Sequence, residues 1–258
     1  ASTVFRLTYI GLIFRTNPGC SPSVLQNSWS ALGFTKASPK AVRTVSMNAP
    51  ENCNPRLILG SQSWARRTIL QEMGIKFECI APDIDEKATR SPIPEQLVLA
   101  LARAKAKALM SDQRVNGKCA SHSESIRTLL LTCDQVVVHD GKILEKPENT
   151  EQAIEFIRGY GRSPCGTVGA TVLTDVETGR QWEAVDSTSI HFREMSEAEV
   201  AALARDPEAL SCAGALRVEG PARGFIRRIE GDLDAVMGLR KRTVRALLEE
   251  ALAAPCSP

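Results

Sequence analysis

Two adjacent arginines stand where the sequence predicts the start of a helix. Arg66 and Arg67 fall in its first turn, shortly after the N-cap candidate Ser63. The helix dipole disfavours a cation there by about 0.3–1 kcal/mol. A bound anion would reverse that penalty, because free backbone N–H groups, a serine hydroxyl and two guanidinium groups together form a phosphate-binding cradle. The alternative is that both arginines are solvated on the helix surface.

A lysine lies within the apolar stripe of a second predicted helix, residues 94–110. Arg103 and Lys107 fall on the other side of this helix, whereas Lys105 falls inside the stripe. A lysine in that position either extends its ammonium group to water or meets a negatively charged group. The stripe, spaced by three and four residues, consists of Leu97, Val98, Leu101, Ala104, Ala108 and Leu109.

Asp134 interrupts the strongest predicted strand of the chain, residues 129–139. An unpaired carboxylate is costly to bury. Asp134 therefore either faces solvent at a strand end or has a metal ion or a cationic side chain as its partner. Lys146, followed by Pro147, places a further cation just past the hairpin predicted for residues 129–146.

A cluster of carboxylates occupies the predicted loop of residues 81–94. Asp83, Asp85 and Glu86 supply the oxygen ligands that Mg²⁺ prefers, and Mg²⁺ keeps several of its waters in such sites. The alternative is an acidic loop that is simply solvated.

The elements that must position these residues alternate between strands and helices early in the chain and become richer in strands later. This order predicts an α/β domain with a mixed sheet. Turn signals at Asp140-Gly141 and Thr178-Gly179 join successive strands, and residues 111–128 are predicted to be a surface loop. The helices are predicted at 64–73, 94–110, 148–159, 196–205 (with a capping box of Ser196 and Glu199) and 241–253, and the strands at 56–60, 76–80, 129–139, 167–174 and 182–192.

Composition excludes several classes of protein. The chain of 258 residues is 43% apolar with a net charge of +2, and its 5% aromatic content offers no basic stripe interleaved with aromatic rings. We therefore expect no nucleic-acid partner. Eight cysteines, none closer to another than 14 residues, form no zinc motif and fit a reducing, intracellular compartment. The apolar run Tyr9–Phe14 is too short to cross a bilayer, so we expect no membrane partner.

Several blocks of the sequence, in order and with sensible gaps, resemble the Maf family over residues 56–250. The first block is Leu57–Ser63 followed by Arg66-Arg67. The later blocks are Pro82–Glu86, Leu101-Ala102 with Lys105-Ala106, Cys133–Val137, Lys146-Pro147, Cys212–Gly214 and Gly238-Leu239.

The resemblance implies a fold like that of the inosine-triphosphate pyrophosphatases: an α/β protein with a mixed β-sheet flanked by helices, and two lobes around a central cleft. It also implies a metal-dependent enzyme that uses Mg²⁺ or Mn²⁺ to hydrolyse a non-standard or modified nucleoside triphosphate to the monophosphate and pyrophosphate. A homodimer is compatible with the family. The residue roles that the resemblance implies are Asp134 as general base, Lys105 and Lys146 as catalytic cations, Ser61, Arg66 and Arg67 at the phosphates, and Glu86 with Asp134 at the metal.

The base preference depends on three positions, Ala65, Gln135 and Glu219. Within the family, Gln135 and Glu219 resemble the subtype that acts on 7-methyl-GTP, and a pair of purine donors would suit the Glu219 carboxylate. Ala65 departs both from this pattern and from that of the subtype acting on dTTP and UTP, and Arg240 replaces the usual proline. The preferred base therefore stays open between these substrates.

The N-terminal segment differs from the rest of the chain. Residues 1–50 hold five basic residues, seven Ser, five Thr and no acidic residue, whereas the remainder holds 27 basic and 30 acidic residues. This composition is typical of a chloroplast or mitochondrial transit peptide, and a disordered extension is the alternative. We expect an N-terminal extension over 1–52 and a Maf-like nucleotide pyrophosphatase domain over 53–258, cytoplasmic unless the extension directs it to an organelle.

A second function of a different class is a nucleotide-binding regulator of cell division without significant turnover. A protein that only binds nucleotide does not need a general base, so the presence of Asp134, Lys105 and Lys146 argues against this alternative.

Overall fold

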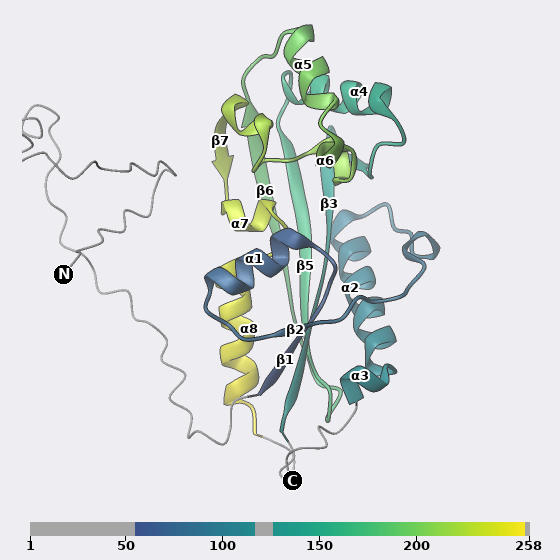
Figure 1. Cartoon of the computed structure of the whole chain (residues 1–258), viewed down its shortest axis with the longest axis vertical. Coiled ribbons are helices and arrows are strands. Elements are labelled where there is room, and N and C mark those ends of the chain that lie inside the picture. The colour runs from purple at the N-terminus through teal and green to yellow at the C-terminus, as the bar shows by residue number, and fades with distance from the viewer. Residues whose placement is uncertain (1–54, 117–125, 256–258) are drawn as a thin grey trace, which may run out of the picture. The chain divides into compact units, whose positions relative to one another are not determined.

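A seven-stranded mixed sheet forms the centre of the protein (Figure 1). The computed structural model describes residues 55–116 and 126–255, so the predicted N-terminal extension over 1–52 lies outside the described residues. The strand order is β2-β1-β3-β5-β6-β7, with β4 paired to β3. β1 runs parallel to β2 and β3, and all other neighbours are antiparallel, which confirms the predicted α/β class with a mixed sheet. The strands are β1 (Arg56–Gly60), β2 (Glu78–Cys79), β3 (Thr128–His139), β4 (Lys142–Leu144), β5 (Cys165–Asp175), β6 (Gln181–Phe192) and β7 (Ile226–Glu230).

Helices cover the sheet and form two lobes along its long strands β3, β5 and β6 (Figure 1). In the first lobe, α1 and α8 pack on one face of the sheet and α2 packs on the other. In the second lobe, α4, α5 and α6 pack on the far ends of the long strands. The helices are α1 (Trp64–Glu72), α2 (Pro94–Met110), α3 (Gln113–Asn116), α4 (Thr150–Tyr160), α5 (Glu197–Ala204), α6 (Pro207–Leu210), α7 (Leu233–Val236) and α8 (Lys241–Ala253), with 3₁₀ turns at Glu86–Ala88, Ala213–Ala215 and Pro221–Phe225.

β1 ends early, and this shapes the site. Its last residue, Gly60, pairs with Thr132, whereas β3 continues to His139. A Cβ on Gly60 would lie 2.5 Å from Leu109 Cδ1 and 2.8 Å from Thr132 Cγ2, so a residue without a side chain lets β1 pack this closely against α2 and β3. The chain then turns into α1, whose first turn is capped by the Ser63 hydroxyl. On that side of β3, residues 133–136 are thus left without a strand neighbour, between β1 and the pairing of β4 with residues 137–139.

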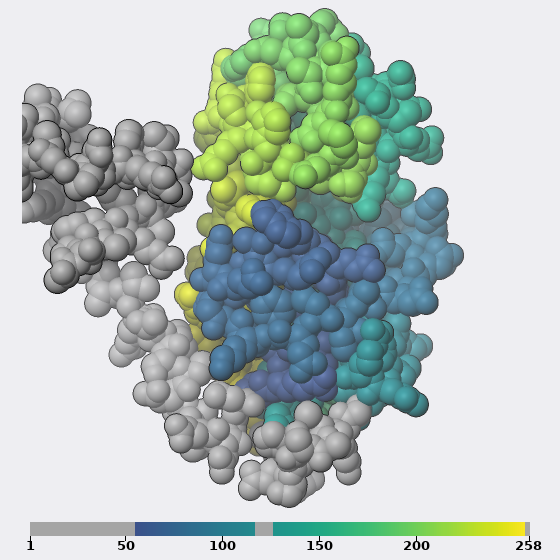
Figure 2. Space-filling view, in the orientation of Figure 1, coloured from purple at the N-terminus to yellow at the C-terminus, as the bar shows by residue number. Residues whose placement is uncertain are grey.

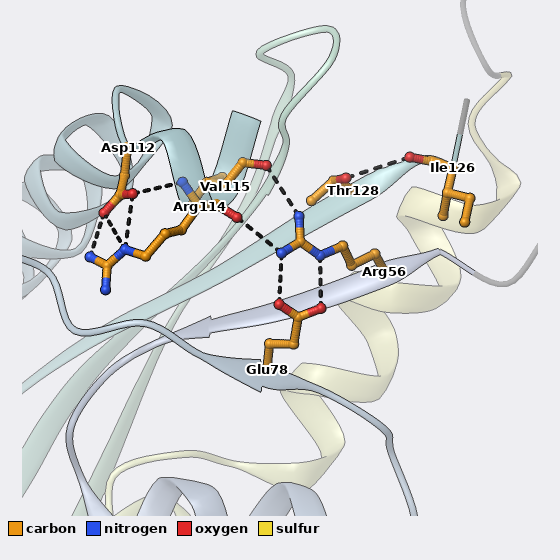
Figure 3. A network of polar contacts seen from close by, with 7 residues as sticks. All are labelled: Arg56, Glu78, Asp112, Arg114, Val115, Ile126 and Thr128. Atoms are coloured by element: carbon orange, nitrogen blue, oxygen red, sulfur yellow. Dashed lines mark hydrogen bonds and ion pairs between the residues drawn. The ribbon is translucent and has the colours of Figure 1, made fainter. Parts of the chain in front are cut away.

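The opposite end of β1 is held by one arginine (Figure 3). The Arg56 guanidinium donates to both carboxylate oxygens of Glu78 on β2, at 2.8 and 2.6 Å, and to the carbonyls of Arg114 and Val115 on α3. The hydrogen bond from Arg56 outweighs partial burial and lowers the pKa of the Glu78 carboxyl. This network ties β1, β2 and α3 together at the end of the sheet away from the cleft described below.

Most predicted elements are present, and the differences have local causes. Gly74 ends α1 at a φ of 73°, and the capping box of Ser196 and Glu199 begins α5, as expected. Residues 111–128 were expected to be a loop, but residues 113–116 form α3, which Asp112 caps through the backbone N–H of Arg114. β7 was not expected, because only Ile226 and Ile229 of this edge strand are even partly buried and their spacing of three is not that of a strand.

None of the helices in the described residues is both long and apolar enough to cross a membrane.

Candidate active site

One buried ammonium group joins two carboxylates from different parts of the chain. Lys105 Nζ on α2 lies 2.6 Å from Asp134 Oδ1 on β3 and 2.8 Å from Glu86 Oε1 in the loop before α2. The side chains of Lys105 and Asp134 are 8% and 10% exposed, whereas that of Glu86 is 57% exposed. Lys105 therefore meets a negative group instead of extending to water, and Asp134 has a cationic partner.

The strand and helix patterns explain why these side chains meet. Side chains alternate along β3, so Asp134 shares a face with Thr132 and Val136. This face packs against α2, because Thr132 donates to the Ala102 carbonyl at 2.8 Å and Val136 belongs to the cluster around α2. The buried stripe of α2 differs from the prediction at its alanines: Ala102 and Ala106 are fully buried, and Ala104 and Ala108 are not. The small side chains of Ala102 and Ala106, before and after Lys105, therefore let α2 approach β3 closely.

Burial and charge act in opposite directions on the two carboxyls. Burial raises the pKa of Asp134, despite the hydrogen bond from Lys105 and the nearby charge of Arg66. Burial acts in the same direction on Glu86, but the hydrogen bond and charge of Lys105, together with Lys146 and Arg66, lower the pKa of that carboxyl on balance. The pKa values of the two acids that share one ammonium group are thus shifted in opposite directions.

Arg66 fills the gap left where β1 ends. Its Nη1 donates to the Cys133 carbonyl at 3.1 Å and to Ser61 Oγ at 3.4 Å, and its Nε donates to the Gly238 carbonyl at 3.0 Å. These acceptors compensate for placing a cation at the start of α1. Arg67, by contrast, is exposed and donates to the Gln62 carbonyl at 2.8 Å, so the structure does not bring it to the other candidate phosphate ligands.

A cleft of about 860 Å³ contains the candidate residues and lies beside the carboxyl end of β1. Open α/β sheets bind their ligands in this position. Figure 2 shows this side of the protein, where the blue segment around α1 borders the green segment of the second lobe. The charged residues that line the cleft are the cations Arg66, Lys105, Lys146 and Arg217 and the carboxylates Glu86, Asp134, Glu208 and Glu219.

The three predicted base-specificity residues, Ala65, Gln135 and Glu219, all line this cleft. The Gln135 amide is fixed by its Nε2 group, which donates to the Ala235 carbonyl at 2.7 Å. A carbonyl can only accept, so this bond fixes which end of the amide is the nitrogen and leaves the amide oxygen and the second N–H of Nε2 for a ligand. Trp64, which the sequence patterns did not identify, is 64% exposed and lines the cleft. An aromatic ring at the first position of the helix, beside a candidate specificity residue, was the signal that could have identified it.

The predicted acidic cluster does not act as a unit. Glu86 lines the cleft, whereas Asp83 is exposed outside it and Asp85 caps the 3₁₀ turn through the backbone N–H of Lys87. Among the described residues, no group of three or more Asp, Glu, His or Cys side chains could hold a metal ion. What the structure does offer is a pair of carboxylates, Glu86 and Asp134, that converge on one cation. Such a pair fits a divalent ion that takes its remaining ligands from phosphates and water.

Comparisons with known proteins show which proteins this chain resembles. The sequence profile of the Maf-like protein family matches residues 56–251. A 7-methyl-GTP pyrophosphatase of Dictyostelium discoideum is 36% identical over 194 residues, which cover 75% of this chain and 96% of the relative. A nucleoside triphosphate pyrophosphatase of Salinispora tropica is 39% identical over 196 residues, covering 76% and 83%. A solved dITP/XTP pyrophosphatase of Mycobacterium abscessus aligns with a TM-score of 0.34 at 12% identity, over 77% of this chain and 96% of that one.

The hydrogen bonds of Arg66 lead to a prediction about stability. Lysine has a single ammonium group in place of the guanidinium fork, so Arg66→Lys should leave the carbonyl of Cys133 or Gly238 unsatisfied. We expect it to lower the free energy of unfolding by about 1–3 kcal/mol, as measured by denaturant titration. The matched control is Arg67→Lys, which affects one exposed contact and should change stability little. Equal effects of the two substitutions would contradict this role of Arg66.

Proposed function

This chain belongs to the Maf family, and we propose that it is a nucleoside triphosphate pyrophosphatase that releases pyrophosphate from a purine nucleotide in a cation-dependent reaction. One observation carries the proposal: a buried lysine, two carboxylates and a partly buried arginine converge in a single cleft beside the end of a parallel strand. The relatives named as pyrophosphatases support hydrolysis, and they do not favour the alternative of a regulator without turnover.

Charge balance supports the need for a divalent cation. The cleft is lined by four cationic and four carboxylate side chains, so its own charges cancel. A triphosphate would therefore bring negative charge that the protein does not offset. Mg²⁺ or Mn²⁺ supplies positive charge that stabilises the triphosphate and its developing leaving group, and Glu86 and Asp134 are the residues that would hold it.

The side chains of the cleft have distinct parts in the proposed reaction. Asp134 accepts a proton from a water molecule and orients that water toward the α-phosphorus. The water oxygen forms a bond to the α-phosphorus as the bond between the α-phosphorus and the α,β-bridging oxygen breaks. The products are the nucleoside monophosphate and pyrophosphate. Arg66, Lys105 and Lys146 offset the charge on the departing pyrophosphate. Ser61, buried at 7% exposure and hydrogen-bonded to Arg66, positions that guanidinium.

The hydrogen-bond acceptors and the aromatic ring beside the predicted base-specificity residues favour guanine over thymine or uracil. The free Gln135 amide oxygen and the Glu219 carboxylate are both acceptors. Guanine presents two adjacent donors along its Watson–Crick edge, whereas thymine and uracil present one donor between two carbonyl acceptors. The exposed ring of Trp64 supplies a stacking surface, and aromatic faces attract cationic rings such as 7-methylguanine. We therefore place 7-methyl-GTP ahead of dTTP and UTP.

The role of Asp134 is tested by Asp134→Asn. We expect turnover to fall by about 10²–10⁴-fold or more, because the amide cannot take the proton of the water. Nucleotide affinity, followed by quenching of tryptophan fluorescence, should stay close to that of the wild type. The control is Asp83→Asn, which changes an exposed aspartate outside the cleft. Near-normal pyrophosphate release from Asp134→Asn would rule out this assignment.

The raised pKa of Asp134 leads to a prediction about pH. A base works only when it has lost its proton, so kcat/KM should fall as the pH drops through the pKa of Asp134 in the free enzyme. Since burial raises that pKa, the fall should begin at a higher pH than for an exposed aspartate. The measurement is a pH profile of kcat/KM at a metal concentration that saturates the nucleotide but not the free enzyme, with folding monitored by circular dichroism. A rate that stays constant down to the range of an ordinary aspartate would contradict the prediction.

The base preference is tested by Glu219→Gln. Loss of a charged acceptor should lower kcat/KM for 7-methyl-GTP by about 10–100-fold and change the value for UTP much less. Pyrophosphate release would be measured on a panel of 7-methyl-GTP, GTP, ITP, dTTP and UTP, with and without Mg²⁺ or Mn²⁺. Glu249→Gln, an exposed substitution on α8 with the same change in charge, is the control. Equal losses on 7-methyl-GTP and UTP would show that Glu219 does not read the base.

A further inference from the structure

Lys105 holds the position between the two carboxylates that a cation would be expected to take. Its ammonium group lies within hydrogen-bond distance of Asp134 Oδ1 and Glu86 Oε1 at once. These are also the converging carboxylates of the cleft that fit a divalent ion. An ammonium ion and a divalent ion repel each other strongly at such distances, the more so in a partly buried site. In the arrangement observed, Lys105 therefore competes with a divalent ion for these oxygens.

The burial of Lys105 restricts its ammonium group to the position between the two carboxylates. Its side chain is 8% exposed and enters the cleft from a helix whose neighbouring residues Ala102 and Ala106 are fully buried. The ammonium group has few alternative positions within this packing, and withdrawing it without a new negative partner would leave a buried charge unpaired. A triphosphate supplies such a partner, because its oxygens accept hydrogen bonds from an ammonium group.

We propose that Lys105 is a resident counter-ion that keeps Glu86 and Asp134 from binding a divalent cation until a triphosphate enters the cleft. Phosphate oxygens then take over the ammonium group, and the two carboxylates become available to the cation that accompanies the nucleotide. Metal binding is thereby made dependent on substrate. This inference rests on the proposed function in taking a triphosphate as the ligand that displaces Lys105.

The test measures binding of Mn²⁺ to the protein itself, not turnover. Water-proton relaxation detects Mn²⁺ held on a slowly tumbling protein, and the titrations would be made at pH 8 so that the carboxyls are ionised. We expect the wild type to bind Mn²⁺ weakly alone and strongly with α,β-methylene GTP, an analogue whose bridging carbon prevents cleavage. Lys105→Met should bind Mn²⁺ alone at least about tenfold more tightly than the wild type, since the competing charge is gone.

Matched variants test whether the two carboxylates cause the gain in Mn²⁺ affinity. Lys107→Met removes an exposed lysine from the same helix and should leave Mn²⁺ affinity unchanged. Adding Asp134→Asn to Lys105→Met should abolish the gain. If Lys105→Met does not fold, Lys105→Gln, which keeps a polar group without the charge, takes its place, and the comparison of the wild type with and without the analogue stands on its own.

Two outcomes would overturn the inference: tight Mn²⁺ binding by the wild type without nucleotide, or no gain in affinity on removing the Lys105 charge. Pyrophosphate release from the same preparations separates this result from the proposed function. Absence of metal-dependent hydrolysis would refute the proposed reaction, whereas the Mn²⁺ titrations decide whether Lys105 masks the carboxylate pair.

Discussion

The contact between Lys105 and Asp134 is the constraint on which the rest of the site depends. A carboxylate on a strand face that is otherwise packed against a helix needs a partner, because an unpaired buried charge costs several kcal/mol. Lys105 meets that need at 2.6 Å, and the burial of Ala102 and Ala106 brings its helix close enough to do so. The loop before α2 is drawn in as well, because the same ammonium group contacts Glu86. Two ion pairs that share one ammonium group thus fix strand, helix and loop relative to one another.

A second constraint comes from the backbone of β3. Buried backbone groups must be hydrogen-bonded, and between the pairings with β1 and β4 residues 133–136 of β3 have no strand neighbour on that side. Arg66 supplies a donor to the Cys133 carbonyl and joins the same region to the Gly238 carbonyl. A guanidinium group that completes the fold in this way is held rigidly, directly beside the space where the cleft opens. The early end of β1 therefore creates both the cavity and the need for the cation that lines it.

The sequence predicted the parts of the protein whose signals are local. Apolar runs located β1 and β3, and cap residues located the starts of α1 and α5, because both depend on near neighbours in the chain. Lys105 and Asp134 were identified because each is a charged residue within an apolar pattern. Only the packing of α2 on β3 shows that the two charges pair with each other. The role of Asp85 as a cap and the fixed amide of Gln135 depend on contacts that periodicity does not describe, the second with a residue 100 positions away. Edge strand β7 was not predicted because three of its five residues, Arg227, Arg228 and Glu230, are exposed.

The energetics of buried ion pairs argue that this contact serves chemistry and not stability. Desolvating two charges offsets most of their attraction, and apolar side chains of similar size often stabilise such a position equally well. Two apolar residues at positions 105 and 134 would therefore satisfy the packing between α2 and β3. They would not raise the pKa of a carboxyl beside a cleft, and they would not place an ammonium group where a phosphate can take it over. In the proposed reaction both properties are used, because burial raises the pKa of Asp134 while Lys105 favours its charged form until the substrate arrives.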